Sequence, residues 1–187
     1  QITEGLCREL CERQINSLPS AIDAALKMSG KIKRISEKIA YYDDVFFIGR
    51  GIDAEICKEG SLKLKEISYI HSEAYAAGEL KHGTISLVVE GTPIIALTTQ
   101  SDVCQKTISA IREVASRGAY VLSVASESLA RANSIPCDGQ ILIPDVREML
   151  AVFPTATALQ LLAYFVSAGK GLDVDKPRNL AKSVTVE

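Results

Sequence analysis

Three charged side chains spaced one helical turn apart are the residues best suited to do chemistry in this sequence. Glu59, Lys63 and Glu66 stand at positions i, i+4 and i+7, so on a helix all three project from one face. One interpretation is a solvated stripe of ion pairs, which would contribute little. The charges are interleaved with large apolar residues, however, which is typical of a partly desolvated cleft where a carboxylate and an ammonium tune each other's pKa. These apolar residues are Ile56, Leu62, Ile67 and Ile70.

Two histidines and five cysteines complete the set of reactive side chains. His82 lies in a polar segment beside a glycine and is the better acid/base candidate, whereas His71 follows an apolar residue and is interpreted as structural. Cys7 and Cys11 are one helical turn apart, but the histidines are distant, so we expect no zinc site. The odd number and wide scatter of the cysteines predict reduced thiols, and we expect neither a metal nor a cofactor.

Composition argues against several classes of function. The 187 residues, 47% hydrophobic and 24% charged, suffice for one α/β domain with a core of its own. The formal charge of −2 gives no electrostatic footprint for nucleic acid. No signal-peptide pattern opens the sequence, and its apolar stretches are expected to be too short to span a membrane. We therefore expect a cytoplasmic protein without nucleic-acid or membrane partners.

Short apolar runs predict a parallel sheet. They are rich in β-branched residues and do not alternate strictly, which is typical of strands covered on both faces. Helical segments separate them, so right-handed crossovers are expected. The predicted fold class is α/β, a three-layer doubly wound parallel sheet of about five strands. The strands are expected at 45–48, 73–76, 93–97, 120–124 and 140–143, and the helices near 53–70, 103–117 and 127–132.

Further segments flank this sheet. Residues 2–42 carry apolar residues at helical spacing, interrupted by Pro19 and Gly30, which predicts two or three helices packed on the sheet unit or on a partner. Another helix, apolar nearly all round, is expected over 155–168. Residues 173–187 show no periodicity, and pattern alone predicts a frayed end there. We expect one domain over 1–187, with a helical segment over 1–43, an α/β core over 44–172 and a tail over 173–187.

Two short sequences at strand ends suggest ligand contacts. Residues 49–54 (GRGIDA) fit the G-x-G-x-x-[G/A] dinucleotide fingerprint, with Glu73 as the acidic ribose partner. A strand–helix turn needs glycine in any case, so nicotinamide binding is a minor alternative. Asp53 is expected to be the helix N-cap. The stretch Thr98–Asp102 could cradle a phosphate, but its terminal aspartate would repel an anion, so ordinary helix capping is favoured.

Two longer stretches point to one family. Residues 59–83 (EGSLKLKEISYIHSEAYAAGELKHG) and 177–187 (PRNLAKSVTVE) strongly resemble glutamine–fructose-6-phosphate aminotransferase, also called glucosamine-6-phosphate synthase. The resemblance covers the whole chain, which is similar to the second of that enzyme's two sugar-isomerase (SIS) subdomains with its C-terminal tail. It implies an SIS-like fold and a cytoplasmic protein that is at least a homodimer. It also implies a reaction that makes glucosamine 6-phosphate from fructose 6-phosphate and glutamine.

The resemblance implies roles for five residues. Glu66 matches the carboxylate that moves a proton between C1 and C2 of the sugar, and Lys63 matches a lysine that stabilises charge beside it. His82 matches the acid/base group that opens the sugar ring, which is supplied to the neighbouring subunit's site. Lys182 matches the tail lysine that forms a Schiff base with the open-chain sugar, and Ala181 is expected to contact substrate beside it. The tail would fold over the sugar and exclude water.

The sequence departs from the family pattern at three points. The Ser-x-Ser-Gly-Glu-Thr loop that holds the sugar phosphate in that family is absent, and Thr98–Asp102 matches it only in part. The glutaminase with its terminal cysteine nucleophile is absent, and Thr84 replaces the usual proline after His-Gly. We therefore expect an isomerase portion that needs an upstream SIS half and a glutaminase for activity.

The alternative is a non-catalytic module that binds sugar phosphates or dimerises. Such a module would have no need of an acid/base carboxylate, a histidine and an amine nucleophile together. The joint presence of Glu66, His82 and Lys182 therefore favours the catalytic interpretation.

Overall fold

Five parallel strands form the centre of the molecule within residues 2–178, the part of the chain that the computed structural model describes; side chains are described from residue 12 onward. Every neighbouring pair of strands is parallel, in the order β2-β1-β3-β4-β5. The predicted doubly wound parallel sheet is therefore confirmed. The strands are β1 (Asp44–Gly49), β2 (His71–Ala76), β3 (Pro93–Thr98), β4 (Tyr120–Ser126) and β5 (Gly139–Ile143).

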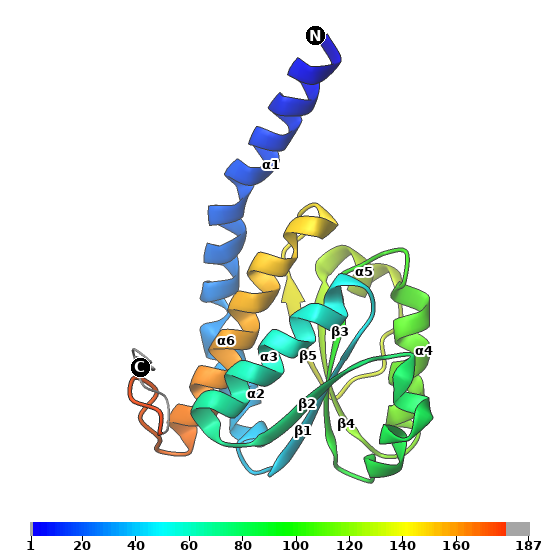
Figure 1. Cartoon of the computed structure of the whole chain (residues 1–187), viewed down its shortest axis with the longest axis vertical. Coiled ribbons are helices and arrows are strands. Elements are labelled where there is room, and N and C mark those ends of the chain that lie inside the picture. Colours follow the sequence, from blue (N-terminus) through cyan, green and yellow to red (C-terminus); the bar gives the residue numbers. More distant parts are fainter. Residues whose placement is uncertain (1, 179–187) are drawn as a thin grey trace, which may run out of the picture.

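Helices cover both faces of the sheet, which makes three layers (Figure 1). One face packs against α2 (Ser29–Ile39), α3 (Ile52–Ser68) and α6 (Val152–Gly169), and the other against α4 (Cys104–Ala115). Helix α1 (Ile2–Lys27) packs on α6, and Figure 1 shows its N-terminal part extending beyond the sheet and its helices. The remaining helical elements are α5 (Glu127–Ala132) and the 3-10 helices η1 (Glu79–His82), η2 (Thr84–Leu87) and η3 (Glu148–Leu150).

Strand β1 shows why the predicted strands are continuous apolar runs. Phe47 packs into the core shared with α2, α3 and α6, whereas its neighbours Phe46 and Ile48 pack into the core against α4. All three side chains are at most 4% exposed. Because successive side chains of a strand point to opposite faces, a strand covered on both faces is apolar at every position.

The N-terminal segment forms two helices, within the predicted range. Pro19 lies inside α1 and does not end it, and Gly30 lies in the first turn of α2. Ala21 and Ala25, which follow the proline, are buried against the rest of the fold. This packing offsets the hydrogen bond that a proline removes from the interior of a helix.

Helix α6 corrects the expectation that every apolar stretch is too short to span a membrane. Residues Glu148–Gly169, 22 in number, are long and apolar enough to cross one by length and composition. In this fold the helix packs against α1, α2 and α3. Ala158 and Val166 are fully buried in it. Packing against these helices accounts for the apolar residues on the covered side, whereas Phe153 and Tyr164 are 47% and 46% exposed.

Candidate active site

The predicted row of charges lies on one face of α3, toward its C-terminal end. Lys63 Nζ lies 2.8 Å from Glu66 Oε2 and 4.0 Å from Glu59 Oε1. The Lys63 and Glu66 side chains are 35% and 27% exposed, so this pair is partly shielded from solvent. The hydrogen bond to Glu66 raises the pKa of Lys63 above its ordinary value. The pair is therefore a fixed ammonium beside a carboxylate.

An apolar groove borders this charged face. It has a volume of about 500 Å³, is lined by side chains of α1, α3 and α6, and reaches Glu59. Of the apolar residues interleaved with the charges, Ile56 and Ile70 are buried, whereas Leu62 is 44% exposed. The charged face thus lies at the edge of apolar surface. The apolar residues along the groove are Ile22, Ile52, Ile56, Val152, Phe153 and Ala156.

His82 and Glu66 lie at opposite ends of the sheet. Because the strands are parallel, α3 runs back from their carboxyl ends to their amino ends, and Glu66 lies about 21 Å along its axis from Ile52. His82 ends η1, which follows the carboxyl end of β2. A single copy of the chain therefore does not bring these two predicted residues together.

Arg50 lies beside the turn that leads to His82 and was not among the candidate residues predicted from sequence. Its Nη1 and Nη2 atoms lie 3.1 and 3.2 Å from where a Cβ would stand on Gly78, so a larger residue there would displace the guanidinium. Arg50 Nε is buried and has no hydrogen-bond partner in the described part of the chain. Its place between two glycines at the end of a buried strand is the sequence signal that could have identified it.

The residue after Gly83, where the family usually has proline, is tied to the edge of the sheet. Thr84 begins η2 and lies near Tyr75 of β2, where its hydroxyl opposes the rise in the pKa of that tyrosine. Gly83 has a φ of 144°, which favours glycine. The loop after His82 is thus shaped by a glycine and a hydroxyl contact.

Two carboxylates occupy the loop after β3. The Thr99 backbone N–H donates to Asp53 Oδ2 at 2.8 Å, and the Thr99 hydroxyl donates to Oδ1. The Ser101 N–H donates to Glu148 Oε1 at 3.0 Å. Two N–H groups that could have held a phosphate are therefore already bound to side chains of this chain.

Neither helix start next to these loops is capped as predicted. Gly51, with a φ of 58°, is the N-cap of α3, and Asp53 lies inside the helix with its carboxylate turned to Thr99. Val103 is the N-cap of α4, without a side-chain cap. The capping roles expected of Asp53 and Thr98–Asp102 are therefore wrong, because the Asp53 carboxylate makes a tertiary contact instead.

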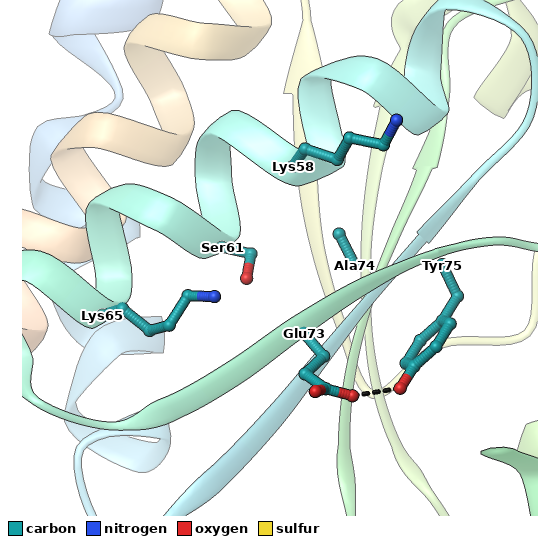
Figure 2. A pocket seen from close by; sticks show the side chains of 6 residues that line it. All are labelled: Lys58, Ser61, Lys65, Glu73, Ala74 and Tyr75. Carbon is teal, nitrogen blue, oxygen red and sulfur yellow. Dashed lines mark hydrogen bonds between the residues drawn. The ribbon is translucent and has the colours of Figure 1, made fainter.

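Glu73 does not stand where a ribose-binding acid is needed. It lies in the middle of β2, opposite Phe46 of β1, whereas such a residue should follow the carboxyl end of the strand. Figure 2 shows Glu73 joined by a hydrogen bond to Tyr75 in a pocket of about 370 Å³, with Lys58 and Lys65 extending from α3. That hydrogen bond raises the pKa of Tyr75. This geometry gives no support to nicotinamide binding.

The remaining reactive side chains are those of His71 and the described cysteines. His71 opens β2, and its Nδ1 atom lies 2.6 Å from a carboxylate oxygen of Asp44. Cys57 and Cys104 are buried free thiols, and Cys137 is an exposed one. Burial raises the pKa of Cys57 well above its ordinary value, so this thiol is un-ionised. Among the described side chains no group of three His, Cys, Asp or Glu residues could hold a metal ion.

The chain leaves α6 and returns to the end of α3. The Arg178 N–H donates to the Tyr69 hydroxyl at 2.8 Å, and Figure 1 shows the last described residues beside the end of α3. Tyr69 follows Glu66 by three positions. The tail therefore begins at the same end of the sheet as the Lys63–Glu66 pair. The predicted tail residues Ala181 and Lys182 lie outside the described residues.

Comparisons with known proteins place this fold in a family. The model of the SIS domain matches residues 38–168. The chain is 52% identical over 171 residues to a glutamine–fructose-6-phosphate aminotransferase [isomerizing] of Clostridium acetobutylicum, covering 91% of this chain and 28% of the relative. It is 51% identical over 174 residues to the protein of the same name from Caldanaerobacter subterraneus subsp. tengcongensis, covering 93% of this chain and 28% of that one.

A solved structure agrees with the sequence comparisons. The C-terminal domain of glucosamine-fructose-6-phosphate aminotransferase from Francisella tularensis matches with a TM-score of 0.84 and 35% identity, covering 88% of this chain and 46% of that one. This chain thus spans less than a third of the curated relatives above. The SIS match runs from the end of α2 to the end of α6 and includes the whole sheet. The chain belongs to the SIS domain family.

Proposed function

We propose that this chain is the catalytic half of the isomerase portion of a glutamine-dependent fructose-6-phosphate aminotransferase. The observation that carries the proposal is the Lys63–Glu66 pair, 2.8 Å apart, at the end of α3 where Arg178 brings the tail. Identity of 52% to a relative whose name states this activity supports the same substrate, fructose 6-phosphate, and the same product, glucosamine 6-phosphate. The whole chain, 1–187, then serves as one SIS-type domain.

Glu66 is the proposed proton carrier. Turning a ketose into an amino-aldose requires a proton to leave C1 and to be returned to C2. In the described contacts of Glu66, Oε2 is held by Lys63 and Oε1 is free to take and return that proton. Lys63 stays cationic because of this hydrogen bond and stabilises the negative charge that develops on the sugar.

Lys182 is the proposed nucleophile. Its amine attacks the C2 carbonyl of the open-chain sugar, and loss of water gives a Schiff base; ammonia then adds to the same carbon and displaces the lysine. Ala181 is proposed to contact the sugar beside it. The start of the tail at the end of α3, where the Arg178 N–H donates to the Tyr69 hydroxyl, supports this role.

His82 is proposed to open the sugar ring in the site of a neighbouring copy. The opposite placement of Glu66 and His82 in one chain supports a homodimer in which each copy supplies its histidine to the other. The loop amides of Thr99 and Ser101 are occupied, which supports a phosphate grip contributed by an upstream SIS half. A glutaminase would supply ammonia, in a cytoplasmic enzyme without nucleic-acid or membrane partners.

Borohydride trapping tests the proposal. The 187-residue chain, and a longer protein in which an SIS half precedes it, are incubated with fructose 6-phosphate, reduced and analysed by peptide mass spectrometry. We expect a reduced sugar adduct on Lys182 in the longer protein. Lys170 and Lys176, on the same C-terminal segment, should stay unlabelled and serve as internal controls.

Each labelling pattern has a distinct meaning. Label on Lys182 in both proteins would mean that the chain assembles a working site alone. Label only in the longer protein would support the split site. Sugar binding without label on Lys182 in either protein would contradict the proposed role of the tail and favour a non-catalytic binding module.

A further inference from the structure

A cavity at the amino ends of three strands is lined by residues that the proposed function does not use. Its volume is about 470 Å³, and it is lined by the first residues of β1, β2 and β3, which are Asp44, His71 and Pro93. Figure 1 shows these strand ends at the lower edge of the sheet. The rest of the lining comes from the segments that lead into β1 and β3. We call this cavity the amino-end pocket.

Hydrogen bonds fix the wall of the amino-end pocket that residues 89–92 form. The Thr92 N–H donates to the Val89 carbonyl oxygen at 3.0 Å, and the Val89 N–H donates to the Thr92 hydroxyl at 3.0 Å. The Gly91 N–H donates to the Gly118 carbonyl oxygen at 2.8 Å, which ties this wall to the segment before β4. A ligand would therefore meet a wall that is already formed, and preorganisation of this kind reduces the cost of binding.

The charges that line the amino-end pocket are negative. Three carboxylates line it, those of Asp43, Asp44 and Glu90, together with His71 but with neither lysine nor arginine. The Nδ1 atom of His71 lies 2.6 Å from Asp44 Oδ1, so one of these carboxylates has a partner. Among the side chains that the structure describes, Asp43 and Glu90 form no ion pair with a lysine or arginine. The pocket thus gathers three carboxylates in a chain whose formal charge is only −2.

Apolar side chains surround these carboxylates. Tyr41, Leu87 and Val89 line the pocket and are 90%, 58% and 62% exposed. Phe46 and Pro93 also line it and are buried. Large apolar side chains that remain exposed around a cavity are typical of a surface that binds a partner.

The two parts of this lining select one class of ligand. Three carboxylates would repel a phosphate or a nucleic acid. An apolar ligand would cover Asp43 and Glu90 and leave their charges desolvated without a partner, which costs free energy. An arginine side chain suits both parts, since its stem packs on apolar surface and its planar guanidinium binds carboxylates through paired hydrogen bonds. The guanidinium also stacks on aromatic rings such as that of Tyr41, which a lysine ammonium does less well.

We propose that the amino-end pocket binds an arginine of a partner protein, in an extended segment with an apolar residue on either side. The guanidinium pairs with the carboxylates of Asp43 and Glu90, and its apolar neighbours pack on Leu87 and Val89. The volume of about 470 Å³ lies within the roughly 300–1,000 Å³ of ligand sites and holds more than one side chain. This docking surface does not depend on the proposed function.

Amide chemical shifts of the isotope-labelled chain test the proposal with a defined probe. The probe is the capped tripeptide N-acetyl-Leu-Arg-Leu-amide. We expect saturable shifts of the Val89 and Gly91 amides, whereas Val166 in α6, which does not line the pocket, should not shift. A matched peptide with citrulline in place of arginine keeps the size but not the charge. It should bind at least about tenfold more weakly, because the charge-assisted hydrogen bonds are lost.

Variants separate the charged from the apolar part of the pocket. Asp43→Asn and Glu90→Gln each remove one charge at nearly constant size, and each should weaken the arginine peptide roughly two- to fivefold. Leu87→Ala, at a side chain that is 58% exposed, should weaken the arginine and citrulline peptides alike. The matched control is Asp23→Asn, at an exposed carboxylate paired with Lys27 on α1, and it should change neither affinity. The amide spectrum of each variant also reports whether it is folded.

Several results would overturn the proposal. Equal affinity of the arginine and citrulline peptides would exclude the ion pair, and unchanged affinity in both charge variants would exclude these carboxylates. N-acetylarginine amide that binds as tightly as the tripeptide would assign the pocket to a small cation instead. Pocket shifts that grow with protein concentration in the absence of peptide would assign it to a second copy. A lack of saturable shifts up to about 10 mM peptide would exclude a docking surface here. None of these measurements uses the sugar, so their outcome leaves the proposed function as it stands.

Discussion

The Asp53 carboxylate accepts two hydrogen bonds from Thr99, one from its backbone N–H at 2.8 Å and one from its hydroxyl. Asp53 lies in the first turn of α3, after β1, and Thr99 follows β3. Strands β1 and β3 are neighbours, but the chain continues from β1 to β2 on one side and from β3 to β4 on the other. Open α/β sheets usually bind ligands at such a switch point. In this chain the buried Asp53 carboxylate joins the segments that follow the two strands at that point.

Asp53→Ala should destabilise the fold by about 2–3 kcal/mol, because it leaves the buried N–H and hydroxyl of Thr99 without an acceptor. Urea unfolding monitored by circular dichroism measures this. The matched control is Asp23→Ala, at an exposed carboxylate paired with Lys27 across one helical turn, and it should change stability by less than about 0.5 kcal/mol. Equal losses in the two variants would contradict the structural role of Asp53.

The stability contributed by Asp53 should also depend on pH. Burial raises the pKa of Asp53 above its ordinary value of 3.8, against the opposing effect of the hydrogen bonds from Thr99. A raised carboxyl pKa means that the folded state favours the protonated form of Asp53. The stability that this protonation contributes is fully present below pH 3.8 and is lost as the pH rises through the pKa of the folded state. The free energy of unfolding of the unaltered chain, relative to Asp53→Asn, should therefore fall as the pH is raised. A relative rise would contradict the prediction.

Gly49→Ala should cost about 1–3 kcal/mol. A Cβ there would stand 2.7 Å from the backbone carbonyl carbon of Asp53 and 2.8 Å from its oxygen, so the first turn of α3 would have to move. Gly51→Ala is the comparison, since that position is open but has a φ of 58° and a ψ of −130°, outside the left-handed helical region, and it should cost about 1–3 kcal/mol through backbone strain alone. Thermal and urea unfolding measure both, and a stability of Gly49→Ala equal to that of the unaltered chain would contradict the close contact with Asp53.

Glu66→Gln should reduce the formation of glucosamine 6-phosphate by about 10²- to 10⁴-fold in a protein that carries the upstream parts, because an amide cannot carry the proton. It should also lower the pKa of Lys63, since the hydrogen bond to Glu66 is the main cause that raises it. Kinetics and an NMR titration of labelled Lys63 measure the two effects. The control is Glu55→Gln, at a carboxylate on the same helix that pairs with Lys58 at 2.8 Å. A normal rate in Glu66→Gln would exclude the proposed proton transfer.

The Lys63–Glu66 contact also predicts a pH dependence of stability. Because the Lys63 pKa is raised, the contribution of the pair is present below pH 10.5 and is lost as the pH rises through the folded pKa. Glu66→Gln should remove that loss. Unfolding curves measured across the alkaline range check the sign, and an unchanged alkaline loss in Glu66→Gln would show that another group causes it.

A variant at His82 and a variant at Glu66 should restore activity to each other when they form a mixed dimer. If each copy supplies its histidine to the other's site, a random mixture of inactive Glu66→Gln and His82→Ala proteins restores one intact site in every mixed dimer. We therefore expect about a quarter of the unaltered activity after subunit exchange. A double variant that carries both changes in one chain, mixed in the same way with either single variant, should restore none. No recovery in the mixture of single variants would exclude the shared site.

Local sequence patterns were enough to predict most of the helices and strands and the charged face of α3. The central strands β1, β3 and β4 were predictable because a strand covered on both faces is apolar at nearly every position, and the run from Val45 to Ile48 follows this rule. The edge strand β2, with His71 exposed and Glu73 partly exposed, does not follow it. Local spacing also placed Lys63 beside Glu66, since residues three apart on a helix are neighbours whatever surrounds them. The two long motifs indicated the family for a similar reason, because they are contiguous in sequence.

Contacts between segments that are distant in sequence could be known only from the folded chain. The bond between Asp53 and Thr99 exists because β3 lies beside β1, and strand order is not encoded in the periodicity of either strand. The same holds for the left-handed Tyr69 beneath Arg178, and for the placement of Glu66 and His82 at opposite ends of the sheet. Hydrophobic periodicity reports which side of each element is covered. Which polar groups meet depends on how whole helices and strands pack together. Only that packing gives each buried polar group its hydrogen-bond partner.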